Sequence, residues 1–231
     1  MNMKRNGKRN GDTRPEQVKT YDAPCWRQKR AVNNERIAMK DMFDLQWKLN
    51  ETTLNNIGVN YAAVATDPEL KAVWIENYRK ALSAELAELI REVREHGIGS
   101  KNGKIEVVDM LHFLLSLSHL TSIEPAQVAL SPSNGTSLTD CAVQTFLALD
   151  DLQNSVKWKW WAKGGGFREH LAKTAVLDLW NCFAELCALF DMDFSTVKRI
   201  YIAKNEVNFR RQEQNYNEET KTEEDNLNLP V

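Results

Sequence analysis

The chain has 231 residues, of which 42% are hydrophobic and 27% charged, and its formal net charge at pH 7 is −2. This length can bury a substantial core, and this composition is typical of a soluble globular protein. A dedicated nucleic-acid-binding domain is normally strongly basic, so the charge argues against that class. We expect no membrane segment and no secretory signal, because no apolar run approaches the roughly 18–20 residues that span a bilayer.

Both ends of the chain are polar. Residues 1–32 are rich in Lys and Arg and are predicted to be a largely disordered arm, although a nuclear or organellar address is also compatible with such a segment. Residues 217–231 are predicted to be an acidic, disordered tail. The folded domain is therefore expected over residues 33–216.

The four cysteines are Cys25, Cys141, Cys182 and Cys187. They show no CxxC spacing and mostly have apolar neighbours. Buried free thiols are therefore favoured over a disulfide framework, which indicates a reducing, cytoplasmic location.

Between the two ends the hydrophobic pattern is helical. Apolar residues recur at helical spacing, no stretch alternates like a strand, and the chain contains only 10 Gly and 6 Pro. Asp67 and Pro68 form an N-cap followed by proline at the first helical position, and 97–104, 131–137 and 164–166 act as breakers. The predicted fold class is all-α, a bundle of five to six helices. They are expected at 34–56, 68–95, 104–121, 139–156, 170–190 and 195–216.

The helix at 104–121 is apolar nearly all round, which predicts that it is the buried centre of the bundle, yet it carries one polar stripe. The members of this stripe recur at steps of three or four residues: Glu106, Asp109, His112, Ser116 and His119. Unpaired carboxylates in such surroundings are costly. The preceding helix offers Glu85 and Glu88, three residues apart at the edge of its apolar stripe.

Antiparallel helices with a short connection would bring these two acidic pairs face to face. Four carboxylates without a matching cation would repel one another, and a divalent metal ion would resolve the repulsion. Oxygen ligands favour Mg²⁺ or Mn²⁺ over Zn²⁺. The sequence therefore predicts a Mg²⁺ site, with Mn²⁺ as a possible substitute, made by Glu85, Glu88, Glu106 and Asp109. The alternative for the first pair is a set of solvated salt bridges with neighbouring arginines.

A two-helix unit is repeated along the chain. The helices within 68–121 are echoed by those within 139–190, and each pair is joined by breakers. The second unit lacks most of the acids, although Asp178 and Asn181 keep the three-residue spacing of the second acidic pair. This pattern suggests an ancient duplication with one active and one degenerate half.

Four segments resemble the motifs of one enzyme family. ALSAELAELIREV and KIEVVDMLHFLLSL resemble the ExxE and ExxDxxHF motifs of the dimeric dUTPases, which belong with the MazG-like enzymes to the all-α nucleoside triphosphate pyrophosphatases. LQWKLN resembles their N-terminal helix motif, with a Gln and an Asn four residues apart. YIAKNEVNFRRQEQNY resembles their C-terminal motif. The four motifs occur in the family's order over about 40–216.

The resemblance implies Mg²⁺-dependent hydrolysis of a deoxynucleoside triphosphate, with dUTP favoured, to the monophosphate and pyrophosphate by a homodimer. Glu85 or Glu88 would orient the attacking water or accept its proton. The implied substrate-binding residues are Gln46, Asn50, His112, Phe113, Lys204, Asn208, Arg211 and Tyr216. Lys204 and Arg211 suit phosphate, the amides suit a base edge or a sugar hydroxyl, and Phe113 suits stacking on the base. The alternative for each is a structural or solvated side chain.

One segment departs from the family's pattern. The family usually carries a WKWW-like segment directly after the ExxE helix, whereas here WKWW at 158–161 follows the helix 139–156. Lys159 is therefore only a candidate phosphate contact, approaching the site from elsewhere. Packing of the aromatic residues at a bundle end is the alternative.

Other functions remain open from the sequence. The same metal site would serve a dCTP/dUTP pyrophosphatase or a broader dNTP pyrophosphatase, because metal chemistry does not choose the base. A catalytically inactive homologue would instead bind a nucleotide or a protein partner, but the four intact carboxylates argue against it. A helical scaffold without a ligand would require all four acids to be incidental.

Overall fold

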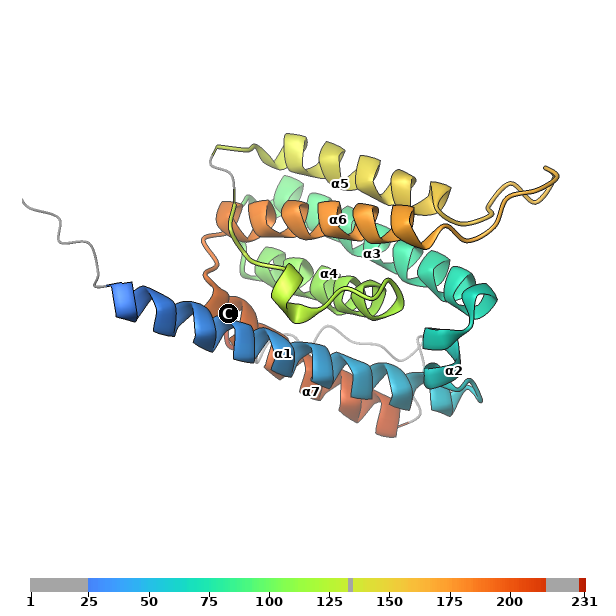
Figure 1. The fold of residues 1–231 in the computed structure, drawn as a ribbon. Helices are drawn as coiled ribbons and strands as arrows, with labels where there is room; N and C mark the ends of the chain where they lie inside the picture. The colour runs from blue at the N-terminus through green and yellow to red at the C-terminus, as the bar shows by residue number, and fades with distance from the viewer. Residues whose placement is uncertain (1–24, 133–134, 215–228) are drawn as a thin grey trace, which may run out of the picture.

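The computed structural model describes residues 25–132, 135–214 and 229–231, with side chains described from residue 34 onward. Within these residues the chain has seven α-helices, one 3-10 turn at Pro125–Gln127 and no strand, so the predicted all-α class is confirmed. The helices are α1 (Cys25–Asn56), α2 (Tyr61–Thr66), α3 (Pro68–His96), α4 (Lys101–Leu120), α5 (Leu138–Asn154), α6 (Glu169–Leu189) and α7 (Phe194–Glu213), shown in Figure 1.

Helix α4 lies at the centre of the bundle. It contacts α1, α3, α6 and α7, and most of its side chains are buried, as the sequence predicted. The hairpins α3–α4 and α5–α6 pack against each other through α3 with α5 and α4 with α6. Helices α1 and α7 pair with each other and cover α4 (Figure 1). A repeated two-helix unit is compatible with this arrangement of two stacked hairpins.

The α3–α4 hairpin has well-defined ends. The Asp67 carboxylate accepts hydrogen bonds from the backbone N–H groups of Glu69 and Leu70, both at 2.9 Å, and Pro68 is the first helical residue, as predicted. Gly97 ends α3 with a φ of 84°, a conformation that glycine adopts at little cost. The short connection turns the chain back, so the end of α3 and the start of α4 lie side by side.

Two helices begin earlier than predicted, and one helix was not predicted at all. Helix α1 begins at Cys25, inside the segment 1–32 that was expected to be disordered, and residues 1–24 lie outside the described residues. The segment 101–104 was expected to break the helix but starts α4, because Ser100 is the N-cap and its Oγ accepts from the Gly103 N–H. Gly103 is a glycine for packing rather than for a break, since a Cβ there would lie 2.6 Å from Phe190 Cε1. Helix α2 was not predicted, since six residues make too few turns to show periodicity.

The described residues bear on two further expectations. None of their helices is long and apolar enough to cross a membrane. Cys141, Cys182 and Cys187 are buried free thiols, as predicted, while the side chain of Cys25 is outside the described part. Most of the expected acidic tail, 215–228, also lies outside it.

Candidate active site

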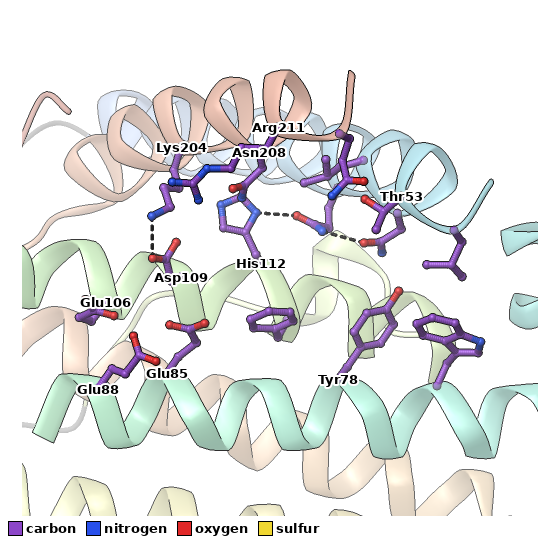
Figure 2. Close-up of a pocket in the computed structure, with 17 residues that line it drawn as sticks. Thr53, Tyr78, Glu85, Glu88, Glu106, Asp109, His112, Lys204, Asn208 and Arg211 are labelled. Carbon is purple, nitrogen blue, oxygen red and sulfur yellow. Dashed lines mark hydrogen bonds and ion pairs between the residues drawn. The ribbon is translucent and has the colours of Figure 1, made fainter. Parts of the chain in front are cut away.

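A cavity of about 280 Å³ opens between α1, α3, α4 and α7 (Figure 2). Apart from Lys159, it is lined by every predicted site residue that the structure describes. Helix α1 contributes Gln46 and Asn50, α3 contributes Glu85 and Glu88, α4 contributes Glu106, Asp109, His112 and Phe113, and α7 contributes Lys204, Asn208 and Arg211. Segments 165 residues apart in the sequence thus meet in one place.

Three carboxylates form the acidic end of the cavity. Glu85, Glu88 and Glu106 each offer an oxygen, and these oxygens all lie within 4.8 Å of one another. Glu85 and Glu88 share one face of α3 because they are three residues apart, and Glu106 faces them from the start of α4. Three converging carboxylate oxygens fit a hard divalent cation such as Mg²⁺.

The electrostatics of Glu106 fit a cation as well. The pKa of its carboxyl is raised to about 7, mainly by burial and also by the negative charges of Asp109 and Glu88. Two groups act in the opposite direction: the Lys204 ammonium, and the Asn102 amide, whose Nδ2 donates to Glu106 Oε1 at 2.9 Å. A divalent ion would offset both the burial and the repulsion.

The fourth acid faces a different partner. Asp109 Oδ2 lies 2.9 Å from Lys204 Nζ, and the Lys204 residue is only 4% exposed (Figure 2). Asp109 is therefore beside the three glutamates but is ion-paired with α7 in this structure. This pair places one positive charge on the side of the cavity opposite α3.

A buried hydrogen-bond network joins α1 to α4. Gln46 Nε2 donates to Asn50 Oδ1 at 2.8 Å and to Ser116 Oγ at 3.2 Å. Asn50 Nδ2 donates to the Tyr61 hydroxyl at 2.9 Å and to Ser116 Oγ at 3.0 Å. Gln46 Oε1 accepts from the Tyr201 hydroxyl at 3.1 Å. Both amides are thus held rigidly by neighbours from α2, α4 and α7.

This network fixes the state of His112. Its Nδ1 lies 2.8 Å from Gln46 Oε1, which can only accept, so Nδ1 carries the proton and Nε2 is an acceptor. The pKa of the imidazole is lowered to about 3, mainly by burial and also by the nearby charge of Lys204. His112 is therefore neutral at physiological pH, and its ring stacks on Tyr201 with centroids 4.6 Å apart.

The structure adds aromatic residues to the site that sequence reasoning missed. Trp74 and Tyr78 of α3 line the cavity beside Phe113, with ring centroids 5.7 Å apart for Trp74 and Tyr78 and 6.4 Å for Tyr78 and Phe113. Tyr78 lies seven residues before Glu85 and therefore on the same face of α3. That heptad spacing was the one available signal, and a tyrosine at such spacing is normally read as core.

Two predicted residues are not placed in the cavity. Lys159 lies in the connection between α5 and α6, is exposed, and has its ammonium 5.0 Å from the centroid of the Trp158 ring. The start of α5 packs beside Ile90 and Arg94 near the end of α3, so its far end and this connection point away from the carboxylates. Tyr216 lies outside the described residues.

An all-helical bundle with converging carboxylates, cationic side chains and aromatic walls in one cavity fits the class of all-α nucleoside triphosphate pyrophosphatases. Over residues 38–216 the chain matches the family model described as dUTPase, and it therefore belongs to the all-α dimeric dUTPase family. Comparisons with curated proteins and with solved structures gave no significant match. The predicted family and enzyme class are confirmed, and family membership supports dUTP hydrolysis and the use of a divalent metal in general.

Proposed function

We propose that this chain hydrolyses dUTP to dUMP and pyrophosphate with Mg²⁺ held by Glu85, Glu88 and Glu106, and with Asp109 completing the site. The proposal rests above all on the meeting of three carboxylates within 4.8 Å in a cavity that also holds cationic and aromatic side chains. Mg²⁺ is favoured, and Mn²⁺ is the second choice, because every ligand is oxygen. When bound, such an ion neutralises phosphate charge and lowers the pKa of an attacking water.

Glu85 and Glu88 are the candidates to orient this water and accept its proton. Glu88 is exposed and Glu85 half-buried, so a water molecule from the solvent can reach them. Glu106 is buried and Asp109 is paired with Lys204, which leaves these two acids better suited to holding the ion. A general base must lie within hydrogen-bond reach of the proton it accepts, and Glu85 and Glu88 belong to the carboxylate cluster that would hold the ion.

Helix α7 supplies the phosphate-binding groups of the proposal. Lys204 and Arg211 are seven residues apart, hence two turns apart on one face, with Asn208 between them. They face the carboxylates across the cavity in Figure 2. Arginine can bind two phosphate oxygens at once, and Lys204 adds a point charge close to the metal ligands.

The nucleoside is bound by Phe113 and His112 in this proposal. Phe113 offers a ring surface for stacking, and neutral His112 presents its Nε2 acceptor. Gln46 and Asn50 act through their neighbours: their hydrogen bonds are made with protein groups, so they hold His112 and Ser116 in position. The sequence led us to expect that the two amides bind a base edge or a sugar hydroxyl directly, and this proposal gives them a positioning role instead.

We also propose a homodimer located in the cytoplasm. Helix α5 exposes Val143, Phe146 and Leu147, which are 50%, 65% and 49% exposed, and an oligomer would cover such an apolar group. The buried free thiols support a reducing compartment. Light scattering should give a dimer at micromolar concentration and a monomer for Phe146→Glu. A wild-type monomer would contradict this part of the proposal.

Pyrophosphate release from a panel of dUTP, dCTP, dTTP, dATP and dGTP, with and without Mg²⁺, tests the function. We expect dUTP to have the highest kcat/KM and Glu85→Gln and Asp109→Asn to lower it at least about 100-fold. Asp178→Asn on α6 is the matched control, since it makes the same chemical change outside the cavity. Undiminished turnover in either site variant would contradict the metal site. Tight dUTP binding without wild-type turnover would indicate an inactive homologue.

A further inference from the structure

Two polar atoms on the wall of the cavity have no hydrogen-bond partner in the protein. Among the buried side-chain atoms that the structure describes, only the Tyr78 hydroxyl and His112 Nε2 lack one, and both residues line the cavity. An unsatisfied buried polar group costs on the order of 1–3 kcal/mol, so native proteins keep few of them. Their location in the candidate active site indicates that a ligand satisfies them.

The neighbouring amides cannot serve the ligand in the same way. Both N–H groups of Gln46 and both of Asn50 donate to protein acceptors, and Asn50 Oδ1 accepts from Gln46 and Ser116. Tyr78 is different, because its O–H is a donor with no acceptor. The hydrogen-bonding capacity left at this end of the cavity therefore includes the phenol of Tyr78.

The surroundings of Tyr78 suit a planar ring. Trp74 and Phe113 flank it, and Leu49 and Leu54 of α1 line the same cavity. Figure 2 shows the Tyr78 ring extending from α3 toward α1, with the hydroxyl at its tip. Burial raises the pKa of this phenol, so it remains a neutral hydroxyl that donates one proton.

The distance along α3 also suits a nucleotide. Tyr78 and Glu85 are two helical turns apart on the same face, which corresponds to about 10 Å along the helix axis. With the phosphates at the carboxylates, a nucleotide extends along α3 and brings its base toward Tyr78.

We propose that the Tyr78 hydroxyl donates a hydrogen bond to a carbonyl oxygen on the edge of the bound base, which makes Tyr78 a determinant of base specificity. This inference rests on the proposed function. The preference for one base over another follows because the Tyr78 hydroxyl has no acceptor within the protein. A base with a carbonyl at this edge satisfies the Tyr78 proton, whereas a base with an amino group there presents another donor and leaves the proton unpaired. Uracil is therefore preferred to cytosine when the acceptor is the C4 carbonyl of uracil, because cytosine has an amino group at that position. The C2 carbonyl is common to both bases and would not distinguish them.

The test is Tyr78→Phe, which removes the hydroxyl and keeps the ring. We expect the ratio of kcat/KM for dUTP to that for dCTP to fall about tenfold, mostly through a higher KM for dUTP. Binding of α,β-imido-dUTP in the presence of Mg²⁺, measured by calorimetry, should weaken by the same factor. The thermal midpoint of the ligand-free variant should not fall, because the hydroxyl makes no bond in the free protein.

Tyr201→Phe is the matched control for stability. Its hydroxyl bonds Gln46 Oε1 and the Met42 carbonyl, both at 3.1 Å, so the same deletion should lower the thermal midpoint. An unchanged dUTP/dCTP ratio in Tyr78→Phe would overturn the role of Tyr78 and leave the proposed function intact. Equal wild-type kcat/KM for dUTP and dCTP would overturn the preference for a carbonyl. Absence of wild-type turnover on both would overturn the proposed function and this inference with it.

Discussion

The hairpins α3–α4 and α5–α6 pack against each other and each consist of two helices, yet they present very different chemistry. The first brings Glu85, Glu88 and Glu106 together in a cavity. The second forms a groove with Asp151 and Asp178, both exposed, and with two buried cysteines, Cys141 and Cys182. In the described residues only the first hairpin brings three metal-ligating side chains within 4.8 Å.

The two hairpins differ in which ionisable side chains they bury and in whether a cation lies near them. Burial raises the pKa of Cys141 to about 12 and also raises that of Cys182, so both thiols stay protonated and suit packing rather than metal binding. The first hairpin instead buries a carboxyl group, Glu106, whose raised pKa shows that its charged form is disfavoured there unless a cation lies nearby. The first hairpin thus buries an acidic side chain, whereas the second buries neutral thiols and leaves Asp151 and Asp178 exposed.

The largest expected effect separates the two hairpins directly. Glu106→Gln should lower kcat/KM for dUTP at least about 100-fold, because it removes a metal ligand while the shape of the side chain is kept. Asp178→Asn should stay within about twofold, since an exposed residue outside the cavity rarely matters. Pyrophosphate release under saturating Mg²⁺ measures both. An equal loss of kcat/KM in the two variants would show that the second hairpin also takes part in the chemistry.

The next effect concerns the ion pair between Asp109 and Lys204. Lys204→Met should lower the free energy of unfolding by about 3 kcal/mol, because it leaves Asp109 and the glutamates without their nearest cation. Asp109→Asn should cost less, since the Glu106 charge still interacts with Lys204. Urea denaturation of the single and double variants gives the coupling between them. Additive losses would mean that the 2.9 Å contact contributes no stability.

The pH dependence of the metal-free protein tests the charge on Glu106. Its folded pKa, about 7, lies above the ordinary value of 4.5, so the folded state holds a proton that the unfolded state has lost between these two values. The free energy of unfolding should therefore fall as pH rises from 4.5 to 7, by on the order of 2 kcal/mol from this group. Glu106→Gln should remove that part of the slope. Denaturation in the presence of EDTA at several pH values measures the free energy of unfolding as a function of pH. The same pH dependence in Glu106→Gln and in the wild type would contradict this prediction.

The smallest effect is expected in the connection between the helices of the second hairpin. Trp160 and Trp161 are 84% and 62% exposed there, and Lys159 does not line the cavity of its own chain. Lys159→Gln should change stability by less than about 0.5 kcal/mol and turnover by less than about twofold. A large loss of turnover with unchanged stability would mean that Lys159 reaches the cavity of a second copy.

The acidic site of the first hairpin could largely be predicted from the sequence, because it follows from the spacing of polar residues along α3 and α4. The polar stripe on α4 was predicted from steps of three and four residues. In the structure Ser116 contacts α1, while Glu106 and Asp109 line the cavity. The joint site of Glu85 and Glu106 followed from the short turn at Gly97. The spacing of residues within one helix depends only on nearby positions in the chain, so it can be read directly from the sequence.

What could not be predicted depends on contacts between distant segments. The resemblance assigns Gln46 and Asn50 to the site, but their hydrogen bonds to Ser116 and Tyr61 involve other helices. That both amides are already hydrogen-bonded within the protein therefore cannot be read from spacing along one helix. Tyr78 has the spacing of a core residue, and only the fold shows that its hydroxyl has no partner. Gly103 predicts a helix break from its low helix propensity, and its packing against Phe190 cannot be foreseen because that ring is far away in the chain.

The most direct test of the central claim is to locate the ion itself. Crystals of the full chain grown with Mn²⁺ and α,β-imido-dUTP should show an anomalous scattering peak among the carboxylates of Glu85, Glu88 and Glu106, with the phosphates between this peak and α7. A peak in the α5–α6 groove, or a nucleotide bound in the cavity with no ion beside these glutamates, would contradict the account.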